Sequence, residues 1–335
     1  MFRIGRRLLP ILQLTRMALV FTALADSGCA LLLYAQEQVP PGGDLTVWSA
    51  IQPRSAIALA FISVGLYGFG MSLNDITDRR RDMQIASYRP LPSGRIGVVT
   101  AHAVCGLLAV IAFVGAIVYS AGGPSGYLSL LIFGFTLTLI VFYDLAAKYL
   151  VAPGLLTLGL IRFFHAALPA PRMAVPWQPL LLLNHITLVS TVAYHWEQKR
   201  PPLTKRHWWS VLGGLAAVDV LLIAAFAWRR KGLAALSITP GLALPGVAVL
   251  GFVLLAIWTR RRNRNARQAG QTLMLRGLLW LIVYDAAFVG GYVGWMPAVM
   301  MLLLLPIAYL SVQLMRWWNQ FVAISQRPAF KRVEM

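Results

Sequence analysis

The sequence predicts an all-α protein, a polytopic membrane bundle of nine to ten transmembrane helices. Of its 335 residues, 59% are hydrophobic and only 12% are charged, and the mean hydropathy is +0.69. An average soluble domain carries about 25% charged residues, so the composition excludes a soluble globular protein and a disordered chain. Apolar runs long enough to cross a bilayer recur along the whole chain, and basic residues separate them.

Ten apolar segments have the length of a crossing, which takes roughly 17–25 residues. They cover residues 17–36, 55–73, 97–119, 126–147, 150–169, 179–196, 208–228, 241–258, 272–290 and 295–314. No small-residue cleavage site follows the first segment, so we interpret it as a crossing and not as a cleaved signal. Gly290, Gly291 and Pro297 join the last two segments closely, so nine crossings is the alternative. Residues 1–335 are predicted to form a single transmembrane domain.

The net charge of +19 is explained by topology. With ten crossings and both termini in the cytoplasm, 24 of the 30 Lys and Arg residues lie on the cytoplasmic side, as the positive-inside rule requires. The cluster Arg229, Arg230 and Lys231 is the one violation. The sequence therefore predicts a multi-pass protein of the cytoplasmic (inner) membrane, whose basic residues face membrane lipid and bind no nucleic acid.

The segment after the second crossing carries the most informative residues. Asn74, Asp78 and Asp82 are spaced four apart, and Asp75 lies on nearly the same helix face. Carboxylates gathered on one face repel one another unless a cation neutralises them, and hard oxygen ligands suit Mg²⁺. The alternative is a solvated helix end with weak Asp–Arg pairs. Side chains that can bind phosphate oxygens follow closely: Arg79, Arg80, Arg81 and Arg89.

These residues resemble a known signature. The pattern NDxxDxxxD at Asn74–Asp82, followed by RPLPSG at Arg89–Gly94, is similar to the first motif of the UbiA superfamily of intramembrane prenyltransferases. Tyr143 and Lys148 resemble the family's Tyr-Ser-x-x-Leu-Lys segment, although Asp144 replaces the serine. The resemblance is good over residues 10–200, extends over 201–335 only as hydrophobic pattern, and is closest to the EboC-like branch.

The family's second acidic motif is degenerate in this sequence. The resemblance places it at the end of the sixth crossing, where Glu197 is the only acidic residue. Glu197 is therefore a predicted ligand of a second Mg²⁺, with His195 a weaker candidate, and the alternative is an interfacial acid paired with Lys199 or Arg200. Four crossings separate Asp82 from Glu197, so both can line one central cavity that opens to the cytoplasmic side.

The resemblance implies transfer of a prenyl group from an allylic isoprenyl diphosphate to a polar or aromatic acceptor through a carbocation. It implies catalytic roles for Asp75, Asp78 and Lys148. The predicted magnesium ligands are Asn74, Asp75, Asp78, Asp82 and Glu197. The predicted substrate-binding residues are Asn74, Arg89, Tyr143, Asp144, Arg162, Asp26 and Glu197.

Polar residues inside the crossings are costly and usually face the bundle interior. Asp26 is a candidate for acceptor binding or cation stabilisation, or alternatively a partner of Arg16 or another helix. Arg162 is predicted to bind diphosphate, and an ion pair with Asp144 is compatible with that role. Asp219 and Asp285 lie outside the well-matched region and are predicted to be structural.

Two other functions compete with the enzyme. A degenerate, non-catalytic relative that binds isoprenoid lipid is supported by the missing second motif. A proton-coupled transporter is less favoured, because such proteins carry pseudo-repeated halves and no internal repeat is visible. Prenyl chain length, oligomeric state and the acceptor do not follow from the sequence.

Overall fold

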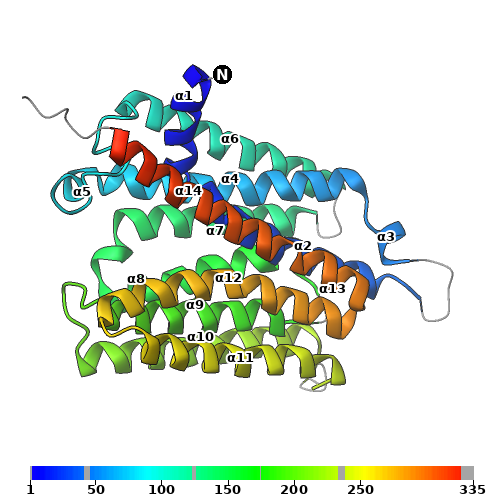
Figure 1. Ribbon diagram of the computed structural model, residues 1–335. Coiled ribbons are helices and arrows are strands. Elements are labelled where there is room, and N and C mark those ends of the chain that lie inside the picture. The colour runs from blue at the N-terminus through cyan, green and yellow to red at the C-terminus, as the bar shows by residue number, and fades with distance from the viewer. Residues whose placement is uncertain (1, 41–45, 123–125, 174, 233–237, 326–335) are drawn as a thin grey trace, which may run out of the picture.

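The computed structural model describes residues 2–40, 46–122, 126–173, 175–232 and 238–325, and these residues form helices without a strand (Figure 1). The long helices are α2 (Val20–Glu37), α4 (Pro53–Thr77), α6 (Val98–Gly122), α7 (Tyr127–Leu145), α8 (Val151–Ala167), α9 (Trp177–Trp196), α10 (Lys205–Arg229), α11 (Ala243–Arg262), α12 (Ala266–Tyr292) and α14 (Leu304–Ser325). Shorter elements are α1 (Phe2–Leu14), η1 (Met17–Leu19), α3 (Val47–Ala50), α5 (Arg79–Ile85), η2 (Ala147–Tyr149), η4 (Pro240–Leu242) and α13 (Trp295–Leu302). The predicted polytopic helical bundle is confirmed.

Each predicted crossing coincides with a helix, and eight helical stretches are long and apolar enough to span a membrane. The other two are α8, which has 17 residues, and α9, which carries polar side chains such as Gln178 and His185. Both pack inside the bundle, where neighbouring helices cover them and a polar side chain can find a partner. Polarity in α8 and α9 therefore reflects their central position.

The last two predicted crossings are separate helices. Helix α12 ends at Tyr292, and Gly294 turns the chain with a φ of 141°, a conformation that favours glycine. Helix α13 then packs against α12, and α14 runs back across α2 towards the end of the bundle where α5 lies (Figure 1). The alternative of one merged span is therefore excluded by the turn.

Burial separates the central helices from the rim. The spanning windows of α2 and α12 are each 56% buried, whereas those of α10, α11 and α13–α14 are each 17% buried. The outer faces carry exposed apolar side chains, including Val220, Leu221 and Val247. A surface this apolar is stable only against lipid, so the chain is a multi-pass membrane protein.

Helices α4 and α6 pack through small residues. A Cβ atom on Gly115 would lie 2.8 Å from the carbonyl oxygen of Ala58, and one on Gly65 would lie 2.7 Å from the backbone nitrogen of Ala112. Close backbone approach of this kind is typical of membrane helices, because packing replaces the hydrophobic effect as the driving force. The contact holds α4 in place, and α4 carries the acidic motif at its end.

The ends of α4, α7 and α9 lie at one end of the bundle, at the left in Figure 1. The starts of α8 and α10 lie there too, and Thr204 begins α10 with a capping box that its side chain shares with His207. The fold therefore brings the acidic motif and the Lys148 segment to one mouth of the bundle.

Candidate active site

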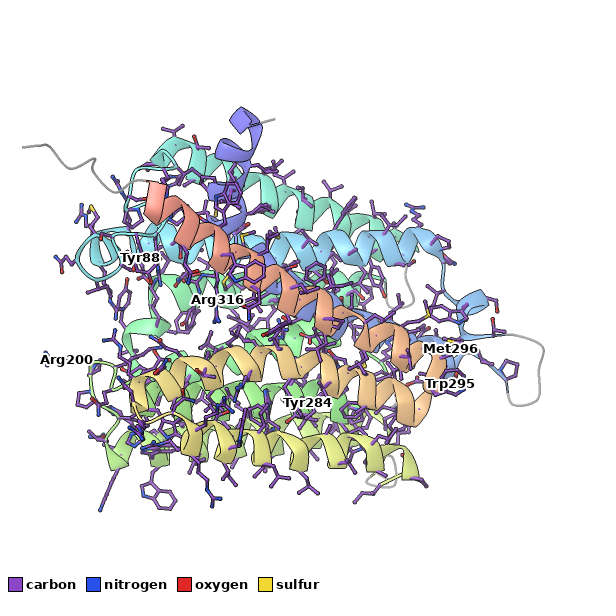
Figure 2. The ribbon with its side chains drawn as sticks, viewed as in Figure 1. Tyr88, Arg200, Tyr284, Trp295, Met296 and Arg316 are labelled. Atoms are coloured by element: carbon purple, nitrogen blue, oxygen red, sulfur yellow. The ribbon has the colours of Figure 1, made fainter. Side chains whose placement is uncertain are left out.

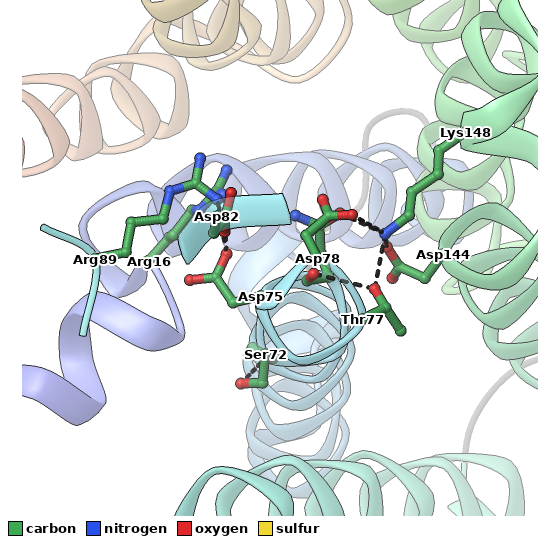
Figure 3. Close-up of polar contacts among 11 residues, drawn as sticks. Arg16, Ser72, Asp75, Thr77, Asp78, Asp82, Arg89, Asp144 and Lys148 are labelled. Carbon is green, nitrogen blue, oxygen red and sulfur yellow. Dashed lines mark hydrogen bonds and ion pairs between the residues drawn. The ribbon is translucent and has the colours of Figure 1, made fainter. Parts of the chain in front are cut away.

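The acidic motif spans the junction of α4 and α5. Helix α4 ends at Thr77 and α5 starts at Arg79, with Asp78 between them at φ −83° and ψ 0°. Seven residues make almost two helical turns, so Asp75 and Asp82 point the same way. Asn74 and Asp78, one turn apart, point to a different side. The single face expected from the spacing is therefore divided into two groups, each of which surrounds a basic side chain (Figure 3).

The first group is centred on Arg89. Its Nη1 atom lies 2.5 Å from Oδ2 of Asp82 and 3.6 Å from Oδ1 of Asp75. Arg16 Nη2 donates a 3.1 Å hydrogen bond to the same Asp75 oxygen. Burial lowers the pKa of Arg89, but the carboxylates of Asp75 and Asp82 raise it more, so its pKa lies above the ordinary value. Arg89 therefore stays charged between two buried carboxylates.

The second group is centred on Lys148, which lies in η2 between α7 and α8. Its Nζ atom lies 2.9 Å from Oδ1 of Asp78 and 3.6 Å from Oδ1 of Asp144. It also donates hydrogen bonds of 2.7 Å to Thr77 Oγ1 and 3.4 Å to Asn74 Oδ1. Four oxygen atoms thus surround one ammonium group, and Figure 3 shows Asp78, Thr77 and Asp144 around Lys148.

The donor atoms of both groups fit a divalent cation in kind. All are hard oxygens of the type that Mg²⁺ prefers, and in each group a cationic side chain stands where positive charge is needed. Among the described residues, no three His, Cys, Asp or Glu side chains come close enough to hold one ion. The structure therefore offers two oxygen-lined positions for positive charge in place of one carboxylate triad.

A cavity of about 250 Å³ opens beside the first group. Asp75, Arg16 and Arg89 line it, together with Tyr88 and, from α14, Arg316. Figure 2 shows Tyr88 and Arg316 at the same end of the bundle. The cavity has more arginines than carboxylates in its wall, so it favours an anionic ligand.

A second polar cluster lies inside the bundle. Asp26 on α2 is fully buried, and its Oδ2 atom lies 2.5 Å from Nε of Arg162 on α8. The ring of His165 lies 3.8 Å from the same carboxylate and makes a 3.1 Å hydrogen bond with Ser63 on α4. Arg162 therefore pairs with Asp26 and not with Asp144, and Arg16 pairs with Asp75 and not with Asp26.

Two further residues join this cluster. Gln178 on α9 donates a 2.8 Å hydrogen bond to Asp285 on α12, and Asp285 contacts the Asp26 side chain. Several other buried polar atoms there make no hydrogen bond: Asp26 Oδ1, Asp285 Oδ2, Gln178 Oε1 and Arg162 Nη2. Sequence reasoning did not link these residues, because they come from four helices and share no local motif. Thr77 was also missed, although it lies within the acidic motif.

Glu197 and Tyr143 have different surroundings. Glu197 follows α9, its Oε2 atom lies 3.3 Å from Lys199 Nζ, and its stem packs against Gly270 on α12. Tyr143 is half-buried on α7 and interacts electrostatically with Asp144 and Asp78. Of the predicted residues, Tyr143 precedes Asp144 of the Lys148 group on α7, and Glu197 has the interfacial pairing with Lys199.

Similarity to known proteins is visible in the structure. No protein-family model and no curated protein matches the sequence. The structure is similar to that of a digeranylgeranylglyceryl phosphate synthase, with a TM-score of 0.57 and 16% identity, over 86% of this chain and 99% of that chain. The chain shares the fold of this synthase. The helical membrane fold that the motif resemblance implies is therefore confirmed.

Structures of a UbiA homologue from Archaeoglobus fulgidus are also similar. The structure bound to DMAPP and Mg²⁺ has a TM-score of 0.43 and 12% identity, over 90% of this chain and 99% of that chain. The structure bound to GPP and Mg²⁺ has a TM-score of 0.44 and 12% identity, over 91% of this chain and 99% of that chain.

Proposed function

We propose that this chain is a Mg²⁺-dependent intramembrane prenyltransferase of the UbiA superfamily. It would move a prenyl group from an allylic isoprenyl diphosphate to a small polar or aromatic acceptor. The observation that carries the proposal is the pair of oxygen and cation groups around Arg89 and Lys148, at one mouth of a membrane bundle with a prenyl-transfer enzyme's fold. The closer assignment to the EboC-like branch remains a prediction.

The basic side chains at the mouth would bind the diphosphate. Arg16, Arg89 and Lys148 are held in place by Asp75, Asp82 and Asp78, so they are already oriented before the donor arrives. As the C–O bond of the donor breaks, these cations would stabilise the negative charge that collects on the leaving diphosphate.

The acidic motif would hold magnesium at the mouth, through Asp75 and Asp82 in the first group and through Asn74 and Asp78 in the second, and bound magnesium would supply Lewis-acid neutralisation of the diphosphate. Glu197 remains a predicted ligand of a second ion. The isoprenoid tail would lie among apolar helices, where exclusion of water protects the allylic carbocation from hydrolysis. Capture by the acceptor's nucleophilic atom forms the new bond to the prenyl carbon, and the acceptor then loses the proton that this atom carried.

The interior cluster of Asp26, Arg162, Gln178 and Asp285 is the proposed contact for the acceptor. Arg162 Nη2, a donor, and Gln178 Oε1, an acceptor, make no hydrogen bond, and this combination suits a hydroxyl group. The same buried acids are the one observation that favours proton-coupled transport, since such acids mark proton paths in membranes. Loss of acceptor-dependent product with intact diphosphate release, in Asp26→Asn protein, would support the acceptor role over transport.

The charge pattern supports an inner-membrane protein with this mouth and both termini on the cytoplasmic side. That side is where a soluble diphosphate and Mg²⁺ would meet the protein.

Diphosphate release tests the proposal directly. Purified protein in lipid nanodiscs, given labelled geranyl diphosphate and Mg²⁺ without an acceptor, is expected to release diphosphate slowly as water captures the prenyl cation, and chelation should stop the release. Asp75→Ala and Asp78→Ala proteins should lose release while remaining folded. Asp219→Asn is the matched control, because Asp219 is an acid on rim helix α10, bonded to Asn184. Equal release in all variants would reject the enzyme and leave a non-catalytic isoprenoid-binding protein.

A further inference from the structure

Two arginines are held against one tryptophan between α11 and α12. The Cζ atoms of Arg262 and Arg276 lie 5.2 Å and 4.6 Å from the ring centroid of Trp258, within the range of a cation–π contact. Arg276 also donates a 2.6 Å hydrogen bond from Nη1 to Thr259 Oγ1. The contacts with Trp258 and Thr259 therefore hold two guanidinium groups near each other before any ligand arrives.

The two guanidinium groups lack an anionic partner. Arg262 and Arg276 repel each other electrostatically, and no carboxylate of the described residues forms an ion pair with either of them. Arg276 is half-buried, so water screens its charge only in part. Like charges held close together are costly unless an anion neutralises them. The pair is therefore suited to a phosphate group, whose oxygens accept hydrogen bonds from several N–H groups of arginine.

The surface beside the pair is apolar and faces lipid. Helix α11 ends at Arg262, at the same end of the bundle as the mouth (Figure 1). Leu250, Leu254 and Trp258 are spaced four apart and share one face of α11, and Leu250 and Leu254 are 66% and 67% exposed. A phospholipid matches both parts, because its phosphate can contact the arginines while a fatty-acid chain lies along this face.

We propose that Arg262 and Arg276 bind the phosphate of one anionic phospholipid, such as phosphatidylglycerol, from the membrane leaflet on the side of the mouth. Trp258 is a positioning residue that holds both guanidinium groups. Phosphatidylcholine fits less well, because its headgroup carries a cation that the two arginines repel. The site uses none of the residues assigned to prenyl transfer, so it does not depend on the proposed function.

Native mass spectrometry tests the site by counting the lipid molecules that stay bound to the purified full-length chain. The protein in detergent is titrated with phosphatidylglycerol or with phosphatidylcholine. The native chain should retain one phosphatidylglycerol at a lipid concentration at least tenfold lower than it needs for phosphatidylcholine. Arg262→Gln and Arg276→Gln should each lose this preference. Arg261→Gln should keep it and is the matched control, since it removes an exposed charge of the same helical turn outside the pair.

Substitutions of Trp258 test the arrangement while every charge stays in place. Trp258→Leu should reduce the preference for phosphatidylglycerol, because the two guanidinium groups lose the ring that holds them. Trp258→Phe should restore most of the preference, since a phenyl ring also offers a cation–π face. Thermal unfolding confirms that each variant is folded.

Three results would overturn the inference. A preference that persists in both Arg262→Gln and Arg276→Gln would show that the pair does not bind the lipid. An equal loss in Arg261→Gln would show a general attraction to the basic end of α11. Displacement of the lipid by an equal concentration of inorganic phosphate would show a site for a soluble anion. The titration contains no allylic diphosphate and no metal, so its result is separate from that of the diphosphate-release assay.

Discussion

Arg162 and Asp26 form an ion pair inside the bundle, with Nε of the arginine 2.5 Å from Oδ2 of the aspartate. The pair joins α8 to α2, and neither helix could carry its charge alone among apolar neighbours. Arg162 was expected at the diphosphate, but its carboxylate partner lies in the interior. Arg162 therefore stabilises the fold and also belongs to the proposed acceptor site.

Breaking this pair should destabilise the fold. Asp26→Leu leaves the guanidinium of Arg162 buried without its ion-pair partner, and loss of one partner in such a pair typically costs about 3–5 kcal/mol. We expect a clearly lower unfolding temperature in detergent for Asp26→Leu. The double variant Asp26→Leu, Arg162→Leu should recover most of the loss, because no unpaired charge remains. A double variant that is less stable than the single one would contradict this prediction.

Replacing Arg89 should weaken donor binding. Arg89→Lys keeps the charge but loses the planar guanidinium, whose Nη1 atom contacts both Asp75 and Asp82. A lost charge-assisted hydrogen bond costs about 1.5–3 kcal/mol, so KM for the allylic diphosphate should rise at least tenfold. Arg206→Lys, on the exposed start of α10, is the control. If the KM of Arg89→Lys is unchanged, Arg89 does not bind the diphosphate.

The α4–α6 contact should not tolerate a larger side chain. Gly115→Val would force a Cβ to 2.8 Å from the Ala58 carbonyl oxygen, and overpacking typically costs about 1–3 kcal/mol. Gly106→Val on the same helix is the matched control, since nothing lies within 4 Å of a Cβ there. The unfolding temperature should drop for Gly115→Val only. If it drops equally in both variants, the cause is the valine within the helix and not the α4–α6 contact.

Topology can be read with impermeant thiol reagents. Both native cysteines, Cys29 and Cys105, are buried, whereas Ser49 and Ser93 are exposed near opposite ends of α4. We expect Ser93→Cys to react only from the cytoplasmic face, and Ser49→Cys only from the other face. Detergent-solubilised protein, in which both should react, is the control for accessibility. The reverse pattern would invert the proposed orientation.

The fold was predictable because each crossing leaves a local signal. An apolar run of the right length, ended by basic residues, marks a helix without knowledge of its neighbours. The turn at Gly294 was less certain, since closely spaced Gly and Pro residues allow either one span or two. Polar α8 and α9 were still identified, although only the surrounding helices explain why their polarity is tolerated.

The site was predictable in its residues but not in its pairings. Motif spacing located Asn74, Asp75, Asp78 and Asp82, and the Lys148 segment, at one mouth. Spacing did not reveal that Asp75 and Asp82 turn to Arg89 while Asp78 turns to Lys148. That division depends on how α5 and α7 pack beside the end of α4. Partners distant in sequence, such as Gln178 and Asp285, leave no local pattern to detect.

Lys148 and Arg89 are the counter-ions of the carboxylates at the mouth in the resting protein. A free divalent ion that entered alone would have to displace an ammonium or guanidinium group and leave it without its carboxylate partner. Only when an anionic headgroup arrives with the metal do the displaced cations regain a partner. The metal ion and the anionic headgroup should therefore bind together, and a metal ion without the headgroup should bind weakly.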